Sequence, residues 1–217
     1  MATADGTAGA SIERVIGEAG WLDDLEAKAP DLVAAFRGIE EGRFISVRRE
    51  VRRRAGAGSA ERVVPQLGAS AAALTAIVAS LPERAFAMSG GEGDWNVSQA
   101  VGHDADARAG LAWAAVLAAQ GRFPADARPV VPGVPGDPGA DRAGLVARLR
   151  RSQRLVESAA ARIAGHETDE CPLEHPQVGR LRCGEWLLFA GVHDLMHLEQ
   201  LRHIAMQVKG GVDVNQG

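Results

Sequence analysis

The chain has 217 residues, of which 46% are hydrophobic and 24% are charged, so it can form one sizeable core with residues remaining for an extension. Its formal net charge of −4 argues against a nucleic-acid-binding protein, because phosphate neutralisation requires a basic surface. The first twenty residues do not resemble a signal peptide, and the apolar runs 69–81 and 109–119 are too short to cross a bilayer. With only Cys171 and Cys183 as thiols, we expect a cytoplasmic protein without a membrane partner.

Short helical patterns occupy the first sixty residues. Apolar residues recur at helical spacing over 12–19 and over 32–39, and glycines at 56–58 predict a linker. We therefore predict a helical N-terminal extension, residues 1–60, followed by a second unit, residues 61–210. Six arginines between Arg43 and Arg54 form a basic cluster, which we interpret as a solvated helix face rather than an anion site.

Four longer amphipathic helices are predicted after this extension, at 61–81, 96–120, 141–163 and 184–209. The second begins with Asn96 and Gln99, the arrangement of a capping box. The first and third have clear buried stripes, namely Leu67, Ala71, Leu74, Val78 and Leu81, and Leu145, Leu149, Ser152, Val156, Ala159 and Ile163. Four helices of this length, without clear alternating strands, predict an all-α protein with an antiparallel four-helix bundle.

Loops separate these predicted helices. Residues 89–93 are rich in glycine, and residues 123–139 are rich in proline and glycine, which predicts an irregular connection. A connection as long as 123–139 is typical of a functional lid or of disorder, and we expect it to cover a pocket.

Three histidines stand beside apolar residues on two of the predicted helices. His103 lies in the second helix, on a face that also carries Ala107 and Gly110, whereas His193 and His197 are neighbours on the fourth. We find no obvious carboxylate partner for them on the buried stripes. Burying three imidazoles without partners would cost several kcal/mol, on the order of the penalty for unpaired polar groups. The sequence therefore predicts a divalent-metal site with His103, His193 and His197 as ligands, which suits zinc, nickel or iron(II).

The remaining candidates are weaker. His203 is expected to face solvent, and His166 and His175 lie in a loop, although His175 would border a pocket if that loop folds over the bundle. Cys183 is kept as a minor candidate for a catalytic thiol. The helical pair of histidines lacks the glutamate that a zinc peptidase places after the first of them, and Asp194 is too short and lies off that face.

Two motifs resemble the DinB-like (DinB/YfiT) superfamily of metalloenzymes over about residues 62–208. They are DWNVSQ at 94–99 followed by His103, and EWLLFAGVHDLMHLEQ at 185–200. The resemblance implies a four-helix bundle with an up-down-down-up course. It also implies a metal held by one histidine of the second helix and two of the fourth, which map onto His103, His193 and His197. The chain departs from the family pattern at Asp104, where a hydrophobic residue is common, and at Cys183.

The function implied by the resemblance is thiol chemistry. Characterised members of the superfamily include S-transferases and isomerases that use bacillithiol, mycothiol or glutathione, so the implied partners are a small electrophilic substrate and a low-molecular-weight thiol. Two alternatives remain open: a metal-dependent hydrolase, with Asp104, Asp106, His175 or Glu199 as proton acceptor, and a non-catalytic metal-binding stress-response protein. A homodimer is expected by analogy with the superfamily.

Overall fold

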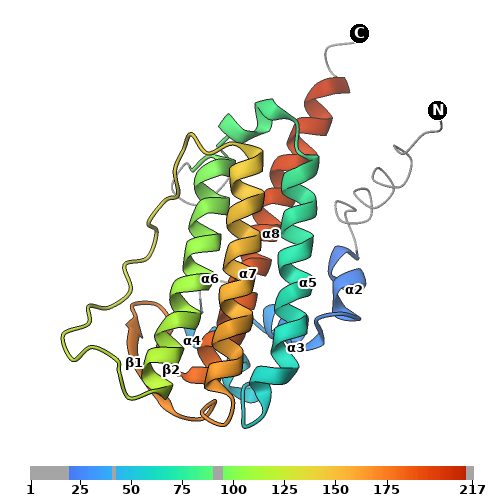
Figure 1. Cartoon of the computed structure of the whole chain (residues 1–217). Helices are drawn as coiled ribbons and strands as arrows, with labels where there is room; N and C mark the ends of the chain where they lie inside the picture. Colours follow the sequence, from blue (N-terminus) through green and yellow to red (C-terminus); the bar gives the residue numbers. More distant parts are fainter. Residues whose placement is uncertain (1–19, 41–42, 90–94, 214–217) are drawn as a thin grey trace, which may run out of the picture.

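The computed structural model describes residues 20–40, 43–89 and 95–213, with side chains described as far as Val208. This part of the chain is mostly helical and contains a two-stranded sheet (Figure 1). The expectation of a mainly helical protein is therefore confirmed, and the two strands are an addition to it. The predicted apolar pattern at 12–19 and most of the predicted loop at 89–93 lie outside the described residues.

Three short helices precede the long ones: α2 (Trp21–Glu26), α3 (Pro30–Arg37) and α4 (Phe44–Arg54). Both α3 and α4 pack against the last helix, α8. Leu32 of α3 lies so close to Gly191 of α8 that a Cβ at that glycine would be only 2.6 Å from it. The apolar side chains of α2–α4 belong to the same hydrophobic core as the rest of the chain. The division into two units at residue 60 stays a prediction.

Four long helices form the main body of the molecule: α5 (Ser59–Ser80), α6 (Val97–Ala119), α7 (Arg142–Ile163) and α8 (Cys183–Asp213). Each of α5 and α6 packs along both α7 and α8. In Figure 1, α5 and α8 run in one direction and α6 and α7 in the other, and a long connection leads from the end of α6 back to the start of α7. A short 3-10 helix, η1 (Glu83–Ala87), follows α5.

Local sequence explains where these helices begin. Asn96 caps α6 by accepting from the Gln99 amide at 2.9 Å, while the Gln99 side chain accepts from the Asn96 amide, so the predicted capping box is confirmed. Asp141 caps α7 through the Gly144 amide. The stripes predicted for α5 and α7 are buried.

Helix α5 is long and apolar enough to span a bilayer, by length and composition alone. The helix covers Ser59–Ser80, which is longer than the apolar run 69–81 identified in the sequence. Its larger apolar side chains, such as Leu67, Leu74 and Val78, are nevertheless buried, and α5 packs against α7 and α8. The core helix of a globular protein commonly has this composition.

A β-hairpin follows α7, with β1 (Glu170–His175) paired antiparallel to β2 (Gly179–Arg182). The expectation of a plain loop at this position is wrong. The strands are short, and their alternation is masked by Pro172 and by charged residues on the exposed side. The hairpin packs against α6 and α8 and so closes one end of the space between them.

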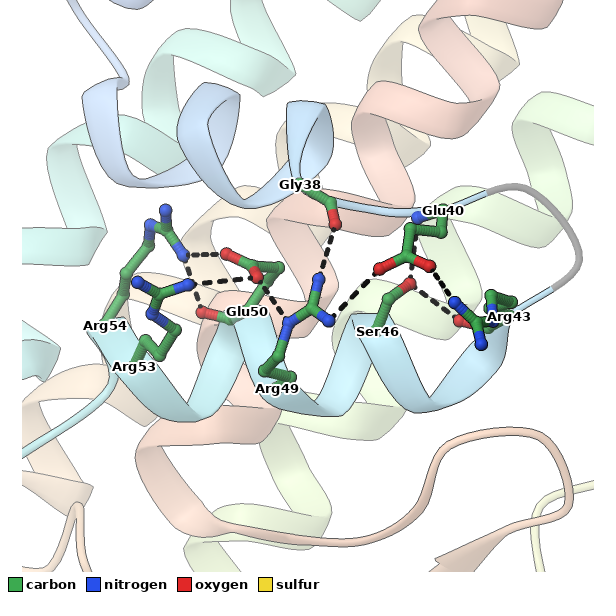
Figure 2. A network of polar contacts seen from close by, with 8 residues as sticks. All are labelled: Gly38, Glu40, Arg43, Ser46, Arg49, Glu50, Arg53 and Arg54. Carbon is green, nitrogen blue, oxygen red and sulfur yellow. Dashed lines mark hydrogen bonds and ion pairs between the residues drawn. The ribbon is translucent and has the colours of Figure 1, made fainter.

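Four arginines of α4 pair with carboxylates, namely Arg49, Arg52, Arg53 and Arg54. Figure 2 shows Glu50 surrounded by Arg49, Arg53 and Arg54, with Arg49 also reaching Glu40. The hydrogen bond from Arg49 is the main reason why the pKa of Glu50 lies below its usual range. Most of these guanidinium groups are partly exposed, as expected of a solvated face. Part of their charge is nevertheless compensated by Glu40 and Glu50.

One arginine of this cluster connects α4 to α8. Arg52 donates to both carboxylate oxygens of Glu185, at 2.9 and 3.3 Å, and the Glu185 side chain is fully buried. Glu185 also accepts from the backbone amide of Arg182. The N-terminal helices and the start of α8 are therefore held together by a charge-assisted contact as well as by apolar packing.

Candidate metal centre

His103, His193 and His197 come together between α6 and α8. One nitrogen atom from each ring lies within 4.8 Å of the others. The ring centroids are 5.2 Å apart for His103 and His193, 5.3 Å for His103 and His197, and 4.5 Å for His193 and His197. In tetrahedral coordination with metal–nitrogen bonds of about 2.1 Å, two ligand nitrogens are about 3.4 Å apart, so the rings would turn toward one another to share an ion.

The Nδ1 atom of each imidazole faces an acceptor oxygen. His103 Nδ1 lies 2.8 Å from the Val134 carbonyl oxygen, His197 Nδ1 lies 3.0 Å from Gln200 Oε1, and His193 Nδ1 lies 3.3 Å from Asp104 Oδ1. The Val134 carbonyl and Gln200 Oε1 are acceptors, so Nδ1 of His103 and of His197 carries the hydrogen and the lone pair is on Nε2. The contact of His193 Nδ1 with the Asp104 carboxylate favours the same tautomer. Such outer partners are what fixes the ring orientation of metal-binding histidines. The residues present therefore fit a divalent ion.

Asp104 is the carboxylate partner that the sequence did not reveal. Its side chain is fully buried behind His193, so the expectation that the histidines lack a carboxylate partner is wrong. Burial by itself favours the protonated acid, but the contact with His193 and the nearby His197 and Arg108 hold the pKa of Asp104 below its usual value. Asp104 is thus suited to orient His193 rather than to act as a proton acceptor in the cavity.

His197 is the most buried of the three rings. Burial lowers its pKa to about 4, and the neighbouring His193 adds to this shift. The imidazole is therefore neutral near pH 7, which is the form that binds a metal ion.

Replacing Asp104 tests its role as the orienting partner. We expect Asp104→Asn to weaken divalent-metal affinity by about 10- to 100-fold, the usual effect of removing an outer-shell carboxylate. Competition against a chromogenic chelator measures this affinity. Asp106→Asn is the matched control, because Asp106 lies on the same helix, is largely exposed and pairs with Arg148. Equal affinities for the two variants would contradict the assignment.

A cavity of about 780 Å³ opens over the three histidines. Its walls come from α4, α6, α8, the hairpin and the proline-rich connection. The lining residues are Phe44, Val47, His103, Asp106, Ala107, Gly110, Leu111, Ala114, Val130, Val131, Pro132, Gly133, Val134, Pro135, Leu173, His175, Gln177, Val178, Phe189, His193, Met196, His197, Glu199, Gln200 and His203. The small side chains that share a face with His103 leave room for this space. The volume is typical of a site for a small organic molecule.

The proline-rich connection forms one wall of the cavity, as expected, and is attached to α6. The Gly136 amide donates to the Gln99 carbonyl at 3.0 Å, and a Cβ on Gly136 would lie 2.7 Å from the Gly102 Cα. At its other end, the Val130 amide donates to the Glu174 carbonyl of β1. The close contact of two glycines places this wall beside His103, where the Val134 carbonyl reaches the ring.

Of the other three histidines, His166 and His203 are exposed and His175 borders the cavity. His166 is exposed and contacts Asp169, and His203 is exposed although it lines the rim of the cavity. His175 borders the cavity, and burial lowers its pKa, with a further contribution from His193. The Gln177 amide donates to its Nδ1 at 3.2 Å, so a neutral His175 carries its proton on Nε2.

Cys183 does not fit a catalytic role. It is fully buried at the start of α8, and burial raises the pKa of its thiol to about 12, with a further contribution from Cys171. A thiol in this environment stays protonated and unreactive near neutral pH.

A buried ion pair between α6 and α8 lies next to Asp104, outside the lining of the cavity. Arg108 Nη1 is 2.5 Å from Asp194 Oδ2, and both side chains are fully buried. Arg108 also contacts Gln153 of α7, and Ser70 of α5 donates to Asp194. The expectation that Asp194 lies off the histidine face is confirmed. The network joins all four long helices, and sequence reasoning missed it.

These features define a predominantly helical protein with a three-histidine group suited to a divalent metal. The model of the DinB superfamily matches residues 66–201, more than half of the chain, and includes all three histidines and Asp104. The chain belongs to the DinB superfamily. Neither the search of curated proteins nor the search of solved structures gave a match.

Proposed function

We propose that this protein is a divalent-metal-dependent enzyme that joins a low-molecular-weight thiol to a small electrophile, as a transferase or an isomerase. His103, His193 and His197 would be the metal ligands. The observation that supports this best is the orientation of the three rings, each with Nδ1 directed at an oxygen. Three histidines that only filled space in the core would not each need an oxygen atom beside Nδ1.

The four long helices would form the antiparallel up-down-down-up bundle that characterises the superfamily. The opposite directions of α5 and α8 relative to α6 and α7, and the long return connection, support this interpretation (Figure 1). Such an order brings the second and fourth helices of the bundle side by side, which is where the histidines are located.

A bound divalent ion would supply a Lewis acid and would lower the pKa of a thiol or a water molecule at the site. An imidazole that binds a metal ion does so in its uncharged form, so three histidine ligands would leave the positive charge of zinc, nickel or iron(II) undiminished. Within the cavity, His175 would present an Nε2–H to the substrate, and Glu199 would accept a proton. The partners proposed are therefore a small-molecule electrophile and a thiol; a homodimer remains a prediction.

Turnover measurements test this function. The metal-loaded protein would be incubated with a chromogenic electrophile and, in turn, bacillithiol, mycothiol and glutathione. We expect turnover that requires a thiol, disappears on chelation and falls by about 100-fold or more in His193→Ala, on the order of the loss seen when a metal-site residue is removed. His166→Ala serves as the control and should retain turnover, because His166 is exposed and does not line the cavity.

The same assay separates the alternatives. Cleavage of a chromogenic ester without any thiol would replace the transferase proposal by a metal-dependent hydrolase, with His175 or Glu199 as the proton acceptor. Bound metal without turnover of either substrate would indicate a non-catalytic metal-binding protein.

A further inference from the structure

One wall of the cavity is apolar. Phe44 and Val47 of α4 contribute to it, as do Val131 and Val134 of the proline-rich connection. Phe44 is 46% exposed, Val131 69% and Val134 54%, which are high values for large apolar side chains. Such a concentration of exposed apolar side chains around one opening usually marks a binding surface.

Cationic side chains do not contribute to this lining. Among the described residues that line the cavity, none is lysine or arginine, and the charged ones are the carboxylates Asp106 and Glu199. A carboxylate or phosphate on a ligand is normally held by arginine or lysine, and a buried anion without such a partner is costly. The part of the cavity beside Phe44, Val47, Val131 and Val134 therefore disfavours an anionic group.

The size of the cavity exceeds what the reacting groups need. A volume of about 780 Å³ lies in the range that accommodates a whole drug-sized molecule. The histidines belong to α6 and α8, whereas Phe44 belongs to α4 and Val131 to the proline-rich connection. Most of the space is thus available to a part of the ligand that does not react.

We propose that the cavity binds an uncharged substrate that carries an apolar chain or ring. The reactive polar end would lie at His103, His193 and His197, and the apolar part would lie between Phe44 and Val47 of α4 and Val131 and Val134 of the connection. The placement of the reactive end rests on the proposed function, whereas the apolar part depends only on the cavity.

Calorimetric titration of the cobalt-loaded protein with unbranched alkanethiols, from ethanethiol to hexanethiol, tests the proposal. Burial of one methylene is worth about 0.8 kcal/mol, so we expect affinity to rise by about fourfold per methylene. A thiol of equal length that ends in a carboxylate should bind at least about tenfold more weakly, the factor that corresponds to 1.4 kcal/mol. Affinity that does not change with chain length, or equal binding of the carboxylate-terminated thiol, would overturn the proposal.

Substitutions in the apolar wall test whether the dependence of affinity on chain length arises there. Phe44→Asp and Val131→Asp should each abolish the dependence on chain length while leaving cobalt binding intact. Leu155→Asp is the control, since Leu155 is similarly exposed at 43% but belongs to α7 and does not line the cavity. A dependence that survives both rim substitutions would also overturn the proposal.

The absorption spectrum of the cobalt protein separates this inference from the proposed function. A sulfur-to-cobalt charge-transfer band shows that the thiol binds at the metal. Chain-length dependence without this band would support the apolar cavity and contradict the thiol function. The charge-transfer band without a dependence of affinity on chain length would support the thiol function and contradict the apolar cavity.

Discussion

Replacing Arg108 by methionine should lower the free energy of unfolding by about 3–5 kcal/mol, a large part of the 5–15 kcal/mol of a typical domain. The change leaves Asp194 fully buried without its ion-pair partner and removes the contact with Gln153. It also interrupts the connection among α5, α6, α7 and α8. Urea unfolding followed by circular dichroism measures the difference.

Two further variants show whether the buried charge is the cause. The double variant Arg108→Met with Asp194→Leu should recover much of the loss, because a buried pair replaced by apolar side chains is often close to neutral. Arg148→Met removes only the half-exposed partner of Asp106 and should cost less than about 1 kcal/mol. A loss for Arg108→Met no larger than for Arg148→Met would contradict the role assigned to the network.

The regular parts of the fold could be predicted because their sequence signals are local. The stripes of α5 and α7 follow a helical period, and the Asn96–Gln99 capping box lies within four residues. The three histidines could be assigned to one site because two are helical neighbours and the third resembles a family motif. Each of these inferences needs only residues that are close in sequence or a known order of motifs.

The outer partners of the site could not be predicted in the same way. Asp104 and Arg108 are charged side chains of α6, yet both are fully buried. Their partners His193 and Asp194 are almost ninety residues away in sequence, so no local pattern connects them. The available signal was that Asp104 and Arg108 stand four residues apart, and so on one face, in a mostly apolar helix.

The hairpin and the cavity wall depend on tertiary contacts as well. Pro172 and the charged residues of β1 hide its alternation, and pairing with β2 decides the conformation. The proline-rich connection is positioned by the contact of Gly136 with Gly102, which a sequence shows only as two unrelated glycines. The acceptor for His103 is the backbone carbonyl of Val134 in this connection, so its position depends on the path of the backbone and not on a side chain.

Alanine at His193 or His197 should remove nearly all bound divalent metal, and alanine at His103 should remove most of it. With His193 or His197 replaced, the two remaining ligands stand on different helices, and a single His103 anchors the ion from α6. Loss of one of three protein ligands weakens a site by far more than loss of an outer partner, which costs about 10- to 100-fold. The variants should stay folded, because the rings line the cavity.

The metal content of the purified protein, measured by elemental analysis after dialysis against buffer without chelator, tests the metal centre most directly. The structure predicts about one divalent ion per chain in the unaltered protein and in the control His203→Ala. It predicts a small fraction of that in His103→Ala, His193→Ala and His197→Ala. The same metal content in all five proteins would contradict the three-histidine centre.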